Sequence, residues 1–112
     1  WESILIDNYF KALKLQEEFT EAKVNILHMT SVEAASKFGS MGPELVHIDA
    51  HHYTPSIEND CEAWLPKLKS GGVVLFHDYA STFPDVTAAV DKYTEGWEDL
   101  GAWDSLAVRR KP

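Results

Sequence analysis

Two short apolar segments with one amphipathic stretch between them constrain the fold of this chain more than any other feature. The segments are 44–49 (ELVHID) and 73–76 (VVLF), and their apolar residues do not alternate cleanly with polar ones, which is typical of strands buried on both faces. Between them, one helix face is traced by Ile57, Cys61, Trp64, Leu65 and Leu68. A strand, a helix and a strand within about 30 residues form a βαβ unit. We therefore expect two parallel strands in one sheet.

Other segments complete an α/β pattern around this unit. Helical spacing predicts helices over residues 2–18 and 31–38, and a further helix that begins at Pro84. Thr54-Pro55 marks the start of the central helix, with proline at its first position. Strands are predicted at 24–27, 96–100 and 105–110, the last two as an antiparallel hairpin that closes one sheet edge. No linker or repeat divides the chain, so residues 1–112 are expected to form one partial α/β domain.

Composition excludes several classes of function. The 112 residues carry a formal net charge of -8, which repels phosphate backbones and makes nucleic acid a poor partner. No apolar stretch approaches the ~20 residues that cross a bilayer, and no signal peptide is visible. The single cysteine, Cys61, excludes an internal disulfide and a cysteine-based zinc cluster, and its place on the helix face predicts a small buried residue. We expect a cytoplasmic protein without membrane contact.

Polar side chains follow both strands of the central unit. Asp49, His51 and His52 come after the first strand, and His77 and Asp78 come after the second. Ligands of open parallel sheets bind outside the carboxyl ends of the strands, and neighbouring strands lie about 4.8 Å apart. A group of carboxylates and imidazoles at that position can hold a divalent cation or move protons. The sequence thus predicts one polar site at this rim.

Each of these residues also has an ordinary structural explanation. Asp49 and Asp78 are residue types that cap helices or form turns, and His77 is equally compatible with packing. One of the pair His51 and His52 is expected to be merely solvated.

Residues outside the rim have simpler predicted roles. His47 lies inside the first strand and is predicted to be a hydrogen-bonded core residue. Trp64 and Phe76 are predicted to be core residues as well. Trp97 and Trp103 fit either the packing of the hairpin or an association surface, and the sequence does not choose between them.

The segment ELVHIDAHHYTPSIENDCEAWLPKLKSGGVVLFHDY resembles the second half of class I S-adenosylmethionine-dependent methyltransferases, in particular the branch that acts on small molecules. The tail GAWDSLAVRRK is similar to the closing hairpin of that family, and the resemblance covers about residues 44 to 110. So many matches at fixed spacing make the signal specific. The positions that carry it are Ile48, Asp49, His52, Tyr53, Asp60, Trp64, Pro66, Leu68, Gly71, Gly72, His77, Asp78 and Tyr79.

The resemblance implies a set of roles at the rim. In metal-dependent relatives, residues after the fourth and fifth strands of the family's sheet hold a cation that orients an acceptor hydroxyl and lowers its pKa. By position, Asp49, His77 and Asp78 are the implied metal ligands. Asp49 or His52 is the implied general base. Asp49 and His51 are assigned to the binding of the methyl donor, S-adenosylmethionine. Some relatives have two acidic residues where this chain has His77-Asp78, so magnesium, manganese, iron and zinc all stay open.

The chain differs from the family in residues 1–43, which precede the first strand of the central unit. The glycine-rich turn that approaches the methyl donor has no counterpart in residues 1 to 43, and the acidic residue that holds the ribose has none either. Only half of a donor site is therefore expected. The resemblance implies a truncated Rossmann-like three-layer sandwich. The missing strands leave either a gap or a direct pairing of 24–27 with 44–49, which would give five strands. We favour the single five-stranded sheet, together with a homodimer that covers the exposed sheet edges.

Two functions follow from these expectations. The first is a metal-assisted transfer of a methyl group from S-adenosylmethionine to a hydroxyl of a small-molecule acceptor, with the donor site incomplete on this chain alone. The alternative is a non-catalytic module of methyltransferase fold that acts in binding or assembly. Hydrolase or oxygenase chemistry at the same cluster is weaker, because three ligand-type residues on two loops form a pattern of low specificity.

Overall fold

The computed structural model describes residues 2–18, 21, 24–39 and 42–112. It divides into two bodies, residues 1–30 and 31–112, which are described separately. In the first body, helix α1 spans Glu2–Glu18 and confirms the predicted first helix. The predicted strand at 24–27 is wrong, because these residues have no regular secondary structure. Four apolar residues become a strand only when a neighbouring strand pairs with them, and the local sequence does not encode that partner.

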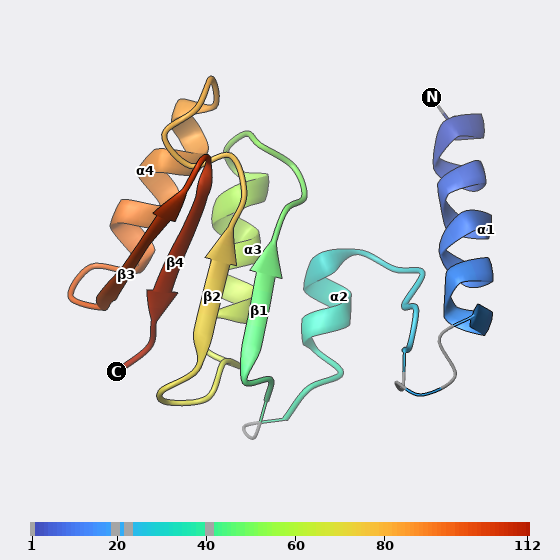
Figure 1. Ribbon diagram of the computed structural model, residues 1–112, viewed down its shortest axis with the longest axis horizontal. Helices are drawn as coiled ribbons and strands as arrows, with labels where there is room; N and C mark the ends of the chain where they lie inside the picture. Colours follow the sequence, from blue (N-terminus) through green and yellow to red (C-terminus); the bar gives the residue numbers. More distant parts are fainter. Residues whose placement is uncertain (1, 19–20, 22–23, 40–41) are drawn as a thin grey trace. The chain divides into compact units, whose positions relative to one another are not determined.

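The second body is built on a four-stranded mixed sheet (Figure 1). Its strands are β1 (Leu45–Ile48), β2 (Val73–Phe76), β3 (Glu98–Trp103) and β4 (Leu106–Arg110), in the order β1-β2-β4-β3. β1 and β2 are parallel with Ile48 opposite Phe76, and β4 pairs antiparallel with both β2 and β3. The predicted βαβ unit and closing hairpin are thus confirmed, in a sheet of four strands among the described residues rather than the five expected. The first hairpin strand was predicted at 96–100, but β3 runs on to Trp103.

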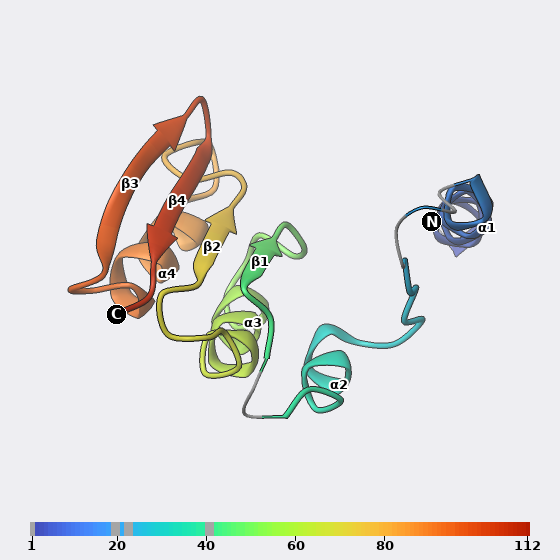
Figure 2. The same cartoon turned by 60° about the horizontal axis from the view of Figure 1, so that its bottom comes forward.

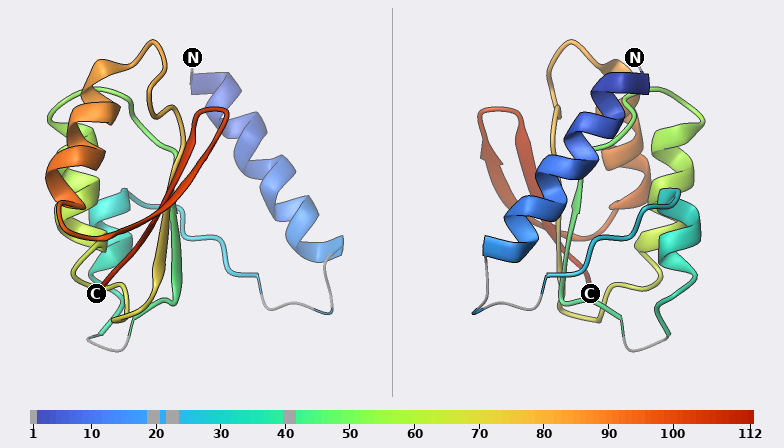
Figure 3. Two further views of the ribbon diagram at one scale, coloured as in Figure 1. Left: turned by 60° about the vertical axis from the view of Figure 1, so that its left-hand side comes forward. Right: turned by 90° about the vertical axis from the view of Figure 1, so that its right-hand side faces the viewer.

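Three helices accompany this sheet: α2 (Ser31–Ala35), α3 (Ser56–Trp64) and α4 (Pro84–Tyr93). α2 ends earlier than predicted, Pro55 precedes α3 as its N-cap instead of occupying the first helical turn, and α4 begins at Pro84 as predicted. α3 and α4 pack on one face of the sheet, and α2 packs against α3 (Figures 2 and 3). Between helices and sheet lies a core that includes Val74, Phe76, Val86, Val90 and Cys61.

The other face of β1 is open, which corrects the expectation of a strand buried on both faces. Val46 and Ile48 are buried under the helices, whereas Leu45 is 56% exposed and His47 is exposed. The prediction that His47 is a core residue is therefore wrong. β1 lies at the outer position of the sheet, and residues 31–112 place helices on one face only, so this body has two layers rather than three.

The hairpin closes the other side of the sheet. Arg109 of β4 is buried, and its guanidinium donates to the Asp99 carboxylate at 2.9 Å. Trp97 is partly buried against the core, whereas Trp103 near the turn is 62% exposed. The structure therefore separates the two tryptophans that the sequence did not distinguish. Among the described residues, no helix is long and apolar enough to span a membrane.

Candidate functional site

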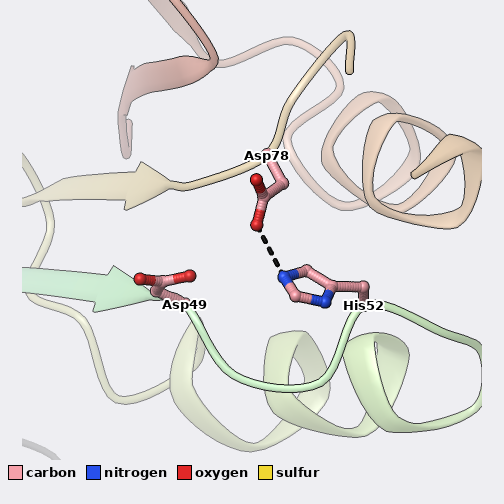
Figure 4. Close-up of side chains that lie close together, drawn as sticks. All are labelled: Asp49, His52 and Asp78. Carbon is pink, nitrogen blue, oxygen red and sulfur yellow. Dashed lines mark ion pairs between the residues drawn. The ribbon is translucent and has the colours of Figure 1, made fainter. Parts of the chain in front are cut away.

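The carboxyl ends of β1 and β2 bring four polar side chains together. Asp49 directly follows β1, His52 lies on the loop that leads to α3, and His77 and Asp78 directly follow β2. Figure 4 shows Asp49 and Asp78 extending from the two strand ends, with the His52 imidazole reaching toward Asp78 from the loop. Because the strands are parallel neighbours in register, their ends meet at one rim, as the sequence predicted.

Asp78 is the centre of this group. Its Oδ2 lies 2.6 Å from Nε2 of His52 and 3.1 Å from Nδ1 of His77. His77 Nδ1 also lies 3.5 Å from Oδ1 of Asp49. The Asp78 side chain is the least exposed of the four, so one shielded carboxylate holds two imidazoles in place.

The backbone of Asp78 is held in an unusual conformation. Asp78 has φ 66° and Ala80 has φ 53°, both in the left-handed region that non-glycine residues rarely adopt. Three hydrogen bonds stabilise the turn: Ser81 Oγ donates to the Asp78 carbonyl, Tyr79 N–H donates to the Ser105 carbonyl, and Ala80 N–H donates to Thr87 Oγ1 of α4. Strain of this kind persists only where surrounding contacts enforce it, and it is concentrated at functional sites.

Thr87 offers a direct test of this turn. Thr87→Val keeps the shape of the side chain but removes the acceptor for the Ala80 N–H. We expect the free energy of unfolding to fall by about 1–2 kcal/mol, because a backbone donor loses its partner. Thr87→Ser keeps the hydroxyl and is expected to retain most of that free energy. Urea denaturation of the three chains measures this, and equal loss in the valine and serine variants would contradict the role of the hydroxyl.

The cluster shifts two pKa values in opposite directions. The hydrogen bond with Asp78, supported by the nearby Asp49 charge, raises the pKa of His77 above 6.5. The hydrogen bonds from His77 and then from His52 lower the pKa of Asp78 below 3.8. A raised imidazole pKa stabilises the fold below pH 6.5, and that contribution is lost as pH rises through the folded-state value. A lowered carboxyl pKa stabilises the fold above pH 3.8, and that contribution is lost as the carboxylate becomes protonated.

This arrangement predicts a titration that depends on Asp78. In the metal-free chain, we expect the His77 imidazole to titrate above pH 6.5, and in Asp78→Asn we expect its midpoint to move down toward that value. Glu95→Gln removes an exposed carboxylate outside the cluster and is expected to leave the midpoint unchanged. NMR titration of the imidazole protons gives the midpoints. A His77 midpoint that is the same in Asp78→Asn would show that the two side chains do not interact.

The same side chains form a donor set for a cation. One ligand atom each from Asp49, His52 and Asp78 lies within 4.8 Å of the other two. Carboxylate oxygens with an imidazole nitrogen suit manganese, iron or zinc, while magnesium prefers oxygen ligands alone. The sequence-based ligand set contained His77 where this group contains His52. His77 contacts both carboxylates but is not one of these three residues. Its assignment as a metal ligand stays a prediction.

The remaining predicted residue, His51, lies outside this group. Its ring is exposed and makes an edge contact with Tyr53, with the centroids 5.6 Å apart. Its assignment to the binding site of the methyl donor stays a prediction.

Sequence reasoning missed the aromatic support of His52. The Phe83 ring stacks on the His52 imidazole with the centroids 4.0 Å apart, and Tyr53 contacts Phe83 edge-on. Asp85 accepts a hydrogen bond from the Thr54 N–H at 2.9 Å, which ties the loop after β1 to α4. No local sequence pattern could have identified these contacts, because Phe83 is far from His52 along the chain.

Cys61 takes no part in this site. Burial raises the pKa of its thiol to about 12, with the neighbouring carboxylate of Asp60 contributing next. A thiol that keeps its proton at neutral pH is neither a nucleophile nor a metal ligand. The prediction of a small buried residue is confirmed.

Comparison with known proteins assigns the family. A family described as a methyltransferase domain matches residues 3–79, well over half of the 112-residue chain. An uncharacterised protein, y4gI of Sinorhizobium fredii, is 38% identical over 53 residues, which is 47% of this chain and 6% of that protein. The chain thus spans a small fraction of the curated relative it matches. The sheet order, the polar rim and the matched residues agree with one conclusion: this chain belongs to the methyltransferase domain family.

Proposed function

We propose that this chain carries the metal- and acceptor-binding half of an S-adenosylmethionine-dependent methyltransferase site. The observation that supports it is the convergence of Asp49, His52 and Asp78, whose ligand atoms lie within 4.8 Å of one another at the rim of a methyltransferase-type sheet. In this proposal the three residues hold a divalent cation, and a small-molecule hydroxyl is the acceptor.

The donor set fits a cation chemically. Two carboxylates supply negative charge, and His52 offers Nε2, the atom that now faces Asp78. A bound cation lowers the pKa of a coordinated hydroxyl, which makes it a stronger nucleophile. His77 is then the proton acceptor of this proposal, since it is exposed and contacts both carboxylates. In the metal-free chain, the hydrogen bond with Asp78 raises the pKa of His77 above 6.5.

The residues present do not form a complete site for the methyl donor. The sequence before β1 contains no glycine-rich turn, and no described strand pairs with the outer edge of β1. The missing turn also supports the second candidate, a non-catalytic module of methyltransferase fold that acts in binding or assembly.

Calorimetric titration separates these functions. We expect Mn²⁺ to bind the metal-free chain with measurable heat, because Asp49, His52 and Asp78 offer three ligand atoms within 4.8 Å of one another. S-adenosylmethionine is expected to give no heat at micromolar protein, with or without Mn²⁺. Heat from the donor would show that the chain contains a working donor site. Silence with magnesium, manganese, iron and zinc alike would remove the metal from the proposal and leave the non-catalytic module.

A further inference from the structure

The start of α4 holds the loop that carries His52. Phe83, the N-cap of α4, stacks its ring on the His52 imidazole, with the centroids 4.0 Å apart and the ring planes at 16° to each other. Two residues further on, the Asp85 carboxylate accepts a hydrogen bond from the Thr54 N–H at 2.9 Å. The ring contact restrains the plane of the imidazole, and the hydrogen bond restrains the backbone beside it. His52 is therefore held through both its side chain and its loop.

The same segment contacts the turn that carries Asp78. Thr87 Oγ1 accepts a hydrogen bond from the Ala80 N–H at 2.9 Å, and this contact supports the left-handed backbone of Asp78. In Figure 1, the loop after β1 and the turn after β2 lie at the end of the sheet where α4 begins. One short segment, residues 83–87, thus contacts both parts of the chain that supply the cluster. The spacing between His52 and Asp78 depends on this segment as well as on the sheet.

Phe83 is itself held in place by the core. Its ring is half-buried and packs against the core cluster between the sheet and the helices. A ring packed in this way keeps few alternative rotamers, and a flat ring stacked on it loses rotational freedom in turn. The His52 side chain is nevertheless 32% exposed. Its imidazole is therefore both restrained and accessible to a cation.

The stack with Phe83 matters most when Nε2 of His52 binds a cation. In the metal-free chain, this atom lies 2.6 Å from Oδ2 of Asp78. An Nε2 atom that binds a cation carries no proton, so it cannot also donate a hydrogen bond to that oxygen. The stack uses the face of the imidazole and is compatible with both states. Ligands that are already oriented bind a metal more tightly, because less conformational freedom is lost on binding.

We propose that residues 83–87 at the start of α4 position the metal ligands of this cluster, and that Phe83 is the positioning residue that aims Nε2 of His52 at Asp78. This inference rests on the proposed function, because it concerns the affinity of the same metal site. Phe83 has no ligand atom of its own, so its effect on the metal passes through His52. Loss of a contact that orients a ligand histidine typically weakens metal binding by about 10- to 100-fold.

NMR spectroscopy of the full, metal-free chain tests the orientation of His52 directly. We expect the ring current of Phe83 to shift the His52 ring protons upfield, and cross-relaxation to connect these protons with the Asp78 side chain. Phe83→Leu keeps an apolar side chain without a ring, so both signals are expected to weaken. Phe83→Tyr and Phe83→Trp keep a flat ring and are expected to retain both. Phe38→Leu removes a ring that contacts Trp64 instead, and is expected to change neither.

Calorimetric titration with Mn²⁺ measures the consequence for the metal. We expect Phe83→Leu to raise the dissociation constant about tenfold or more, and the tyrosine or tryptophan variant to restore most of the affinity. Asp85→Ala is expected to weaken binding and to speed hydrogen exchange at the Thr54 amide. Asp85→Asn keeps a carbonyl acceptor and is expected to restore both. Because asparagine carries no charge, this rescue separates the hydrogen bond from simple attraction of the cation.

Three results would overturn the proposal. The first is the absence of an upfield shift of the His52 ring protons in the natural chain, which requires no variant to fold. The second is a Phe83→Leu variant that binds Mn²⁺ as tightly as the natural chain, and the third is a failure of both aromatic replacements to restore the affinity. If the natural chain binds no metal, the proposed function fails. The NMR comparison of the metal-free chains still decides whether Phe83 aims His52 at Asp78.

Discussion

Asp78→Asn is expected to abolish the rise in melting temperature that Mn²⁺ produces in the natural chain. A ligand at 100 times its dissociation constant stabilises the folded state by about 2.7 kcal/mol. In a domain of this size each kcal/mol corresponds to roughly 4–8 °C, so the expected rise is large. Asp78 supplies the most shielded carboxylate of the cluster and also orients His52 and His77. Its amide replacement therefore removes both a charged ligand and the support of a second one.

Asp49→Asn is expected to behave in the same way, since Asp49 contributes the other carboxylate of the group. Glu95→Gln changes the net charge equally but lies outside the cluster, so it is expected to keep the full metal-dependent rise. Thermal denaturation with increasing Mn²⁺ measures all four chains. If Mn²⁺ raises the melting temperature of Asp78→Asn as much as that of the natural chain, the metal binds elsewhere. If Glu95→Gln loses the rise as well, the effect comes from the net charge of the chain and not from this cluster.

The strands and helices that the sequence predicted well share strong local signals. β2 occupies 73–76 as expected, because a continuous apolar run is bounded by Gly71-Gly72 and by His77-Asp78. α4 begins at Pro84, where proline fits a helix start. Once two such strands are parallel neighbours, the meeting of Asp49 with Asp78 follows from topology alone. The core of the candidate site was therefore predictable.

The details of the site depend on contacts that local patterns do not encode. His52 reaches Asp78 because its ring stacks on Phe83, a residue 31 positions further along the chain that contributes no spacing signal. The left-handed backbone of Asp78 depends on Thr87 and Ser105, which come from separate elements. Exposure was mispredicted at His47 for a related reason. Apolar runs indicate strands, but whether a strand is covered on both faces depends on the neighbours that the rest of the chain provides.

Phe76→Ala is expected to cause the largest loss of stability, about 3–5 kcal/mol. The Phe76 side chain has no exposed surface and packs in the core between the sheet and its helices. Alanine leaves a cavity that the neighbouring residues fill only in part. Small domains have about 5–15 kcal/mol of stability in total, so this variant is expected to approach unfolding at room temperature. Phe76→Leu retains most of the side-chain volume. Its free energy of unfolding, measured by urea denaturation, is expected to lie between those of the natural chain and Phe76→Ala.

Leu75→Ala is the matched control, since Leu75 is the preceding residue of β2 and points to the opposite face. That side chain is only partly buried, so we expect a loss of about 1 kcal/mol, well below that of Phe76→Ala. The comparison also measures how many layers the protein has in solution. Equal losses at the two positions would mean that the open face of the sheet is covered, as the three-layer expectation required. A large difference means that helices pack on one face of the sheet only.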